Sequence, residues 1–143
     1  MNNIPMQIGI DIHGVADLYK ELFKELSIKW HEDGHRIHIV TGQEWEDSVQ
    51  QVEDYGIVYD EHFSIVDRHK QIGTKMYKRS DRKGWWVNPV AWNSSKGNYA
   101  LSYGLDIHFD DQMEYAEYFP AFCTFILVPT TGFDEVCKKM FKW

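Results

Sequence analysis

Apolar residues follow two different spacings along this chain. Short apolar runs, typical of strands inside a sheet, occur at residues 6–11, 36–40, 62–67, 105–109 and 122–128. Segments with an apolar residue every three or four positions, typical of helices that cover a core, occur at residues 15–31, 43–55, 95–103, 113–119 and 133–141. Strands and helices that alternate in this way predict a parallel sheet with helices on both faces.

The predicted architecture is one α/β domain over residues 1–143, a Rossmann-like three-layer sandwich around a mainly parallel five-stranded sheet. A chain of 143 residues is long enough to bury one core. Residues 68–95 follow neither spacing, and we expect an irregular insertion or a small flap there. This segment is rich in lysine and arginine and also contains Trp85, Trp86 and Trp92.

Composition and charge narrow the range of partners. The chain is 43% hydrophobic and 26% charged, as in ordinary globular proteins, and its net charge is −7. This charge argues against nucleic acid as a partner, because binding to a phosphate backbone needs a basic surface. No apolar run has the roughly 18 residues of a membrane span, and no signal-peptide pattern is visible at the start. We therefore expect a cytoplasmic protein without a membrane partner.

Residues suited to chemistry stand where predicted strands end. Asp11 ends the first strand, and Thr41 follows the second. Asp110 and Asp111 follow the fourth. Parallel strands bring their carboxyl ends to one edge of the sheet, so these side chains are expected to converge there. Lys96, at the start of a predicted helix, is expected to join them.

This set of groups suits phosphoryl transfer. Three carboxylates repel one another, and Mg²⁺ removes that repulsion because it prefers oxygen ligands, including those of a substrate phosphate. Thr41 can donate a hydrogen bond to a phosphoryl oxygen, and Lys96 can neutralise phosphate charge. Asp11 is then placed to attack phosphorus and form an aspartyl-phosphate.

These residues, in this order, resemble the haloacid dehalogenase-like (HAD) superfamily over about residues 6–128. The matching motifs are Asp11-Ile12-His13-Gly14-Val15, Ile39-Val40-Thr41-Gly42, Lys96 and His108-Phe109-Asp110-Asp111. The resemblance implies a HAD-like fold, and little or no cap is expected because there is no room for a large insertion between residues 15 and 41.

The resemblance also implies roles for the site residues. The catalytic residues would be Asp11, His13, Thr41 and Lys96. The substrate phosphate would be bound by Thr41, Gly42 and Lys96, and we add Arg68, which follows the third strand, as a further candidate. Magnesium would be bound by Asp11, the backbone carbonyl of His13, Asp110 and Asp111.

His13 stands where HAD phosphatases usually have a second aspartate that acts as acid and base. A histidine can exchange protons near neutral pH, although a nearby Mg²⁺ disfavours its protonated form. Two functions are therefore open. One is a Mg²⁺-dependent phosphohydrolase for a small phosphomonoester, such as a nucleotide. The alternative is a catalytically impaired HAD-fold protein that binds phosphate and metal.

Two other families share parts of these motifs. Asp-Ile-His-Gly also opens the calcineurin-like metallophosphoesterases, but their later metal-binding motifs are missing from this sequence. Receiver domains place their acidic pair after the first strand, so the order differs. The tryptophans of residues 68–95 could stack a nucleobase or dock a partner. The favoured interpretation is that they pack this segment onto the body or form a homodimer patch. His38 and His108 are expected to be structural.

Overall fold

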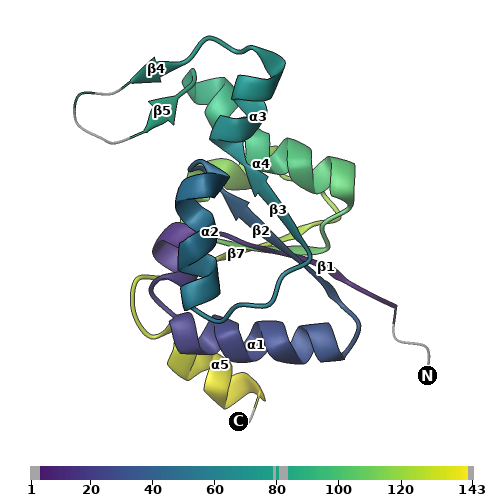
Figure 1. The fold of residues 1–143 in the computed structure, drawn as a ribbon. Helices are drawn as coiled ribbons and strands as arrows, with labels where there is room; N and C mark the ends of the chain where they lie inside the picture. Colours follow the sequence, from purple (N-terminus) through teal and green to yellow (C-terminus); the bar gives the residue numbers. More distant parts are fainter. Residues whose placement is uncertain (1–3, 79, 81–83, 142–143) are drawn as a thin grey trace.

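The computed structural model describes residues 4–78, 80 and 84–141. Five strands form one sheet in the order β3-β2-β1-β6-β7, and every neighbouring pair is parallel (Figure 1). The strands are β1 (Gln7–Ile10), β2 (Arg36–Thr41), β3 (Glu61–Ser64), β6 (Ile107–Asp110) and β7 (Thr124–Leu127). The central strands β1 and β2 are rich in isoleucine, whose branched side chain suits a strand buried on both faces. The predicted five-stranded parallel sheet is confirmed.

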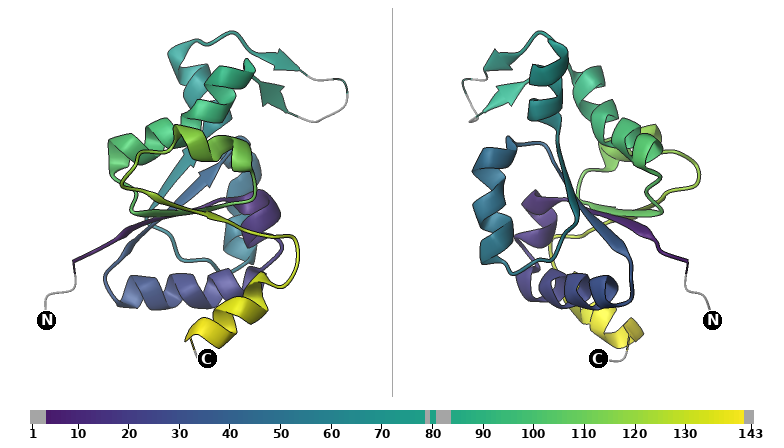
Figure 2. Two further views of the ribbon diagram at one scale, coloured as in Figure 1. Left: turned by 180° about the vertical axis from the view of Figure 1, so that it is seen from behind. Right: turned by 45° about the vertical axis from the view of Figure 1, so that its right-hand side comes forward.

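Helices cover both faces of the sheet (Figure 2). The helices on one face are α1 (Lys20–Glu32), α2 (Trp45–Asp54) and α5 (Phe133–Phe141), and those on the other are α4 (Pro89–Tyr103) and the 3-10 helix η2 (Met113–Tyr118). Ile39 of β2 joins the core that contains Phe23 of α1, whereas its neighbour Val40 packs with Tyr99 of α4. The three-layer arrangement is thus confirmed. Within the described part of the chain, no helix has both the length and the apolar composition of a membrane span.

The third strand ends earlier than predicted. The Ser64 hydroxyl accepts a hydrogen bond from the Asp67 backbone N–H (3.1 Å), which caps the helix α3 (Ile65–Ile72). Gly73 ends this helix in the left-handed conformation, with φ 77°. Residues 65–72, predicted as strand and irregular chain, are therefore helical because a capping serine and a terminal glycine define a helix between them.

The helix that carries Lys96 begins earlier than predicted. Asn88 accepts a hydrogen bond from the Ala91 backbone N–H (2.9 Å), and Pro89 takes the first helical position, where no N–H is needed. α4 therefore starts at residue 89 and not near residue 95. Lys96 consequently lies in the middle of the helix.

Between α3 and α4, a two-stranded hairpin extends away from the sandwich (Figure 1). Its strands β4 (Tyr77–Lys78) and β5 (Trp85–Trp86) are antiparallel. The predicted irregular insertion thus contains a helix, a short hairpin and the first turns of another helix. The basic residues Arg79, Arg82 and Lys83 lie outside the described residues.

Candidate functional site

Three carboxylates meet at the carboxyl edge of the sheet. Asp11 directly follows β1, Asp110 ends β6, and Asp111 is the next residue. β1 and β6 are neighbours, and the Asp11 backbone N–H donates to the Phe109 carbonyl (3.0 Å), which extends their pairing to this point. One oxygen from each carboxylate lies within 4.8 Å of the other two. The sheet order therefore brings together residues that are far apart in the sequence.

Lys96 reaches this cluster from α4. Its side chain is 2% exposed, and Nζ lies 3.0 Å from Asp11 Oδ1 and 2.7 Å from Asp110 Oδ2. The next residue, Gly97, allows η2 to pack against α4, because a Cβ at this position would clash with the Tyr118 carbonyl. Burial alone would lower the pKa of Lys96, but the two carboxylates outweigh burial and raise it. The ammonium group is therefore charged.

Asp110 is hydrogen-bonded through both of its oxygens. Oδ2 accepts from Lys96 (2.7 Å) and from His108 Nε2 (2.9 Å). Oδ1 accepts from the backbone N–H groups of Asp111 (2.8 Å) and Gln112 (3.2 Å). Burial would raise the pKa of Asp110, but the Lys96 charge and the His108 hydrogen bond outweigh burial and lower it. Asp110 is thus a fixed anion that orients Lys96.

His108 has a structural role, in agreement with expectation, and it also supports the site. It is fully buried on β6, and burial lowers its pKa, so the ring is neutral. A carboxylate only accepts hydrogen bonds, so the ring proton lies on Nε2, which donates to Asp110.

The remaining charges of the cluster favour a bound cation. Burial raises the pKa of Asp11 well above its usual range, Lys96 offsets this only in part, and Asp110 raises it further. Burial and the charge of Asp110 also raise the pKa of Asp111. Three carboxylates facing one ammonium leave an excess of negative charge that a divalent cation would balance. The all-oxygen donor set suits a hard cation such as Mg²⁺ or Ca²⁺ and does not choose between them.

The loop after β1 places His13 at the site. The predicted helix from residue 15 is divided here into a tight turn, Ile12–Ala16, and the later helix α1. Gly14 has φ 78°, and a Cβ there would clash with the Asp111 carboxylate, so this turn requires glycine. Asp17 accepts a hydrogen bond from the Gly14 N–H (2.8 Å) and lies 3.7 Å from His13 Nδ1.

Thr41 and Gly42 follow the same edge on β2. Thr41 is fully buried, and its hydroxyl oxygen has no hydrogen-bond partner among residues 4–78, 80 and 84–141. Buried polar groups are nearly always paired, so this hydroxyl is an exception. Thr41 itself is not among the residues that line the cavity beside Asp11, so the structure places its neighbour Gly42 there and not its own side chain. A Cβ added to Gly42 would lie 2.8 Å from the Trp92 ring. Gly42 therefore makes room for Trp92, a role that its assignment as a phosphate-binding residue did not include.

A cavity of about 890 Å³ opens at this edge of the sheet. The predicted site residues that line it are Asp11, His13, Gly42, Lys96 and Asp111. The acidic side chains of Glu44 and Asp47 also line it, and Lys96 is the one lysine or arginine among its described lining residues. An anionic substrate in this cavity would therefore need a cation in addition to Lys96.

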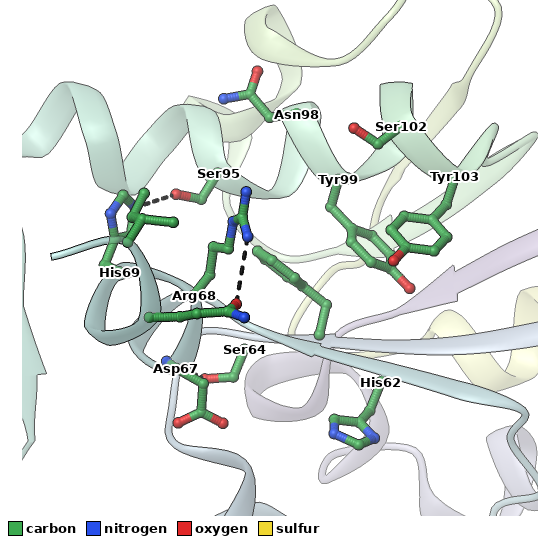
Figure 3. A pocket seen from close by; sticks show the side chains of 13 residues that line it. His62, Ser64, Asp67, Arg68, His69, Ser95, Asn98, Tyr99, Ser102 and Tyr103 are labelled. Atoms are coloured by element: carbon green, nitrogen blue, oxygen red, sulfur yellow. Dashed lines mark hydrogen bonds between the residues drawn. The ribbon is translucent and has the colours of Figure 1, made fainter. Parts of the chain in front are cut away.

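Arg68 lies elsewhere. It belongs to α3 and lines a second cavity, of about 720 Å³, with residues of β3 and α4 (Figure 3). Its Nη1 donates to Gln71 of the same helix (3.4 Å). The structure thus does not bring Arg68 into the cavity of Asp11.

Sequence reasoning missed two residues that contact the site. Tyr115 of η2 has its ring centroid 4.9 Å from Lys96 Nζ, and its hydroxyl accepts a hydrogen bond from Trp92 Nε1 (2.9 Å). Asp17 holds the turn that carries His13. Its spacing of four residues from His13 was a usable signal, whereas nothing in the sequence near Tyr115 pointed to Lys96.

Comparisons of the chain with protein-family models, with curated proteins and with solved structures give no match. The functional assignment therefore rests on the residues of this site.

Proposed function

We propose that this chain is a Mg²⁺-dependent phosphohydrolase of the HAD type that acts on a small phosphomonoester through an aspartyl-phosphate at Asp11. One observation carries the proposal: Lys96 Nζ bridges Asp11 and Asp110 at the edge of an open cavity. The nearby carboxylate of Asp111 supports a metal at this edge, and the charge of Lys96 in the cavity lining supports a phosphate beside it.

In the first step, a carboxylate oxygen of Asp11 attacks phosphorus. A bond forms between this oxygen and phosphorus as the ester P–O bond breaks, and the leaving oxygen takes a proton from His13. Thr41 donates a hydrogen bond to a phosphoryl oxygen, and Lys96 offsets the charge of the phosphoryl group.

In the second step, water attacks phosphorus and gives a proton to His13. The bond between phosphorus and the Asp11 oxygen breaks, which releases inorganic phosphate and restores Asp11. Asp17 holds the turn that carries His13, because its carboxylate accepts a hydrogen bond from the Gly14 N–H (2.8 Å). Bound Mg²⁺ would be held by Asp11, the His13 carbonyl, Asp110 and Asp111, and would supply charge stabilisation to the phosphoryl oxygens.

The second candidate is a protein that binds phosphate and metal without turnover. The observation that favours it is His13 itself, whose side chain is 46% exposed and lies too far from Asp17 for a direct hydrogen bond. A side chain this loosely held transfers protons less efficiently than one fixed next to the reacting atoms, because general acid–base catalysis depends on position.

Phosphate release from a panel of phosphomonoesters with Mg²⁺ separates the two functions. The proposal expects activity in the wild type, none in Asp11→Asn, and a loss of about 10²–10⁴-fold in His13→Ala, the usual effect of removing a general acid–base group. A matched control is His31→Ala, since His31 is also an exposed histidine near a carboxylate, 3.9 Å from Asp60. Phosphate release by His13→Asp but not by the wild type would favour the protein that binds without turnover. If neither the wild type nor His13→Asp releases phosphate, the proposed phosphohydrolase function is overturned.

A further inference from the structure

Three tryptophans form one wall of the cavity that contains Asp11. Trp85 and Trp86 come from β5 and Trp92 from α4; we call them the tryptophan wall. All three are half-buried, and the ring centroids of Trp86 and Trp92 are 4.3 Å apart with an interplanar angle of 31°. The wall therefore presents indole surface to the same space that the carboxylates line.

Specific contacts hold the tryptophan wall in place relative to the phosphate end of the cavity. The Trp92 ring packs over Gly42, directly after Thr41, and its Nε1 donates to the Tyr115 hydroxyl (2.9 Å). The Tyr115 ring in turn lies against Lys96 Nζ (4.9 Å). Trp92 is thus joined by contacts to Gly42, Tyr115 and Lys96, and Trp86 stacks on Trp92.

Polar side chains also line the cavity. Gln51 lines it, and its side-chain carbonyl is buried without a hydrogen-bond partner in the described part of the chain. Such an acceptor is suited to an amino or hydroxyl group of a ligand. Asp47 and Gln43 line the cavity nearby and add further hydrogen-bonding groups.

The volume of about 890 Å³ lies at the upper end of the range for drug-sized ligands and far exceeds the needs of a phosphate group. An aromatic wall, a phosphate-binding edge and unsatisfied polar groups together match a molecule with a planar ring, polar substituents and one phosphate. Base–aromatic stacking accepts any base, because every base has a π face.

We infer that the substrate is a nucleoside monophosphate, whose base stacks on the tryptophan wall while its phosphate lies at Lys96 and Asp11. This inference rests on the proposed function and names its substrate class. The net charge of −7 and the acidic lining residues oppose a polynucleotide, whose additional phosphates would meet negative charge. An aryl phosphate shares the ring and the phosphate but lacks groups to pair with Gln51.

The test compares ligands that differ in one part. Dissociation constants are measured by calorimetry with Asp11→Asn, which prevents turnover, in the presence of Mg²⁺. The ligands are a nucleoside 5′-monophosphate, ribose 5-phosphate, which lacks the base, and phenyl phosphate. The nucleotide is expected to bind about tenfold tighter than either of the others, as the loss of one stacked base or of its polar contacts predicts.

Substitutions of single tryptophans test whether the tryptophan wall causes the preference for the nucleotide. Trp85→Leu in the same background should reduce the preference for the nucleotide over ribose 5-phosphate about tenfold and leave ribose 5-phosphate binding unchanged. Trp45→Leu is the matched control, because Trp45 stacks on His62 (4.0 Å) and is not among the residues that line this cavity. Trp92→Phe, which keeps an aromatic ring over Gly42, should have an intermediate effect and guards against a folding defect in Trp85→Leu.

The outcomes separate this inference from the proposed function. If nucleotide and ribose 5-phosphate bind alike, the inference is overturned even when the wild type releases phosphate. If phenyl phosphate binds as well as the nucleotide, the wall recognises an aromatic ring alone and the nucleotide assignment is overturned. If the nucleotide binds through the wall but no ester is hydrolysed, the proposed function fails and the binding assignment holds.

Discussion

Lys96 is anchored by Asp110: its Nζ lies 2.7 Å from Asp110 Oδ2, closer than the 3.0 Å to Asp11 Oδ1. Asp110 is itself held by His108 and by two backbone N–H groups. The two carboxylates therefore differ, although both touch the same ammonium. Asp110 fixes the position of the Lys96 side chain. Asp11 also lies beside the Lys96 ammonium group, and it lines the cavity.

Replacement of Lys96 should strongly destabilise the fold. Lys96→Met leaves Asp11 and Asp110 buried without their cation, and loss of one partner from a buried ion pair costs about 3–5 kcal/mol. Arg36→Met is the control, since Arg36 pairs with Glu61 (2.9 Å), both side chains are nearly half exposed, and such surface pairs contribute about 1 kcal/mol or less. Urea unfolding without divalent cations measures both. Similar small losses in the two variants would show that Lys96 is not the counter-ion of this cluster.

Substitution of Gly14 and of Gly34 by alanine should lower stability by different amounts, because only Gly14 also packs against Asp111. Gly14 and Gly34 both have positive φ, 78° and 90°, but only at Gly14 would a Cβ meet the Asp111 carboxylate. Gly34→Ala should cost about 1–2 kcal/mol, the penalty of a left-handed residue. Gly14→Ala should cost more and should also weaken Mg²⁺ binding, because Asp111 must move. Equal stability losses with unchanged metal binding, measured by urea unfolding and calorimetry, would contradict this.

Mg²⁺ should raise the melting temperature of the protein by binding to the carboxylate cluster that includes Asp111. A ligand that binds only the folded state stabilises it, by about 2.7 kcal/mol at a hundred times its dissociation constant. Asp111→Asn removes one carboxylate of the cluster and should reduce or abolish this shift. Asp54→Asn on the exposed surface of α2, where the side chain accepts a hydrogen bond from Gln50, should keep it. Thermal unfolding with and without MgCl₂ gives the comparison, and a full shift in Asp111→Asn would place the metal elsewhere.

Asp11→Asn should stabilise the metal-free protein at neutral pH. Burial raises the pKa of Asp11 in the folded chain above the value of about 3.9 that holds in the unfolded chain. The folded state then binds more protons between the two pKa values, so stability falls as pH rises through that interval. Asparagine has no such charge, and its advantage should vanish below about pH 4. Urea unfolding across pH checks this; no advantage at neutral pH would show that Lys96 fully compensates Asp11.

Short-range signals explain where sequence-based prediction of the elements succeeded and where it did not. The five strands and the helices α1, α2 and α5 follow from apolar spacing, which directly reports which side of an element is buried. The start of α3 at Ser64 and of α4 at Asn88-Pro89 depends on capping by single side chains. These capping signals were present in the sequence, but the basic, tryptophan-rich composition of residues 68–95 hid them.

The fold class and the position of Asp11, Thr41, Asp110 and Asp111 at strand ends could be predicted from the amino-acid sequence, because parallel strands share one carboxyl edge. The contacts between these side chains could not. In the folded chain both oxygens of Asp110 accept hydrogen bonds, Arg68 lines another cavity, and Trp92 packs over Gly42. Such contacts join segments distant in the chain and depend on packing between layers, which periodicity within one element does not encode.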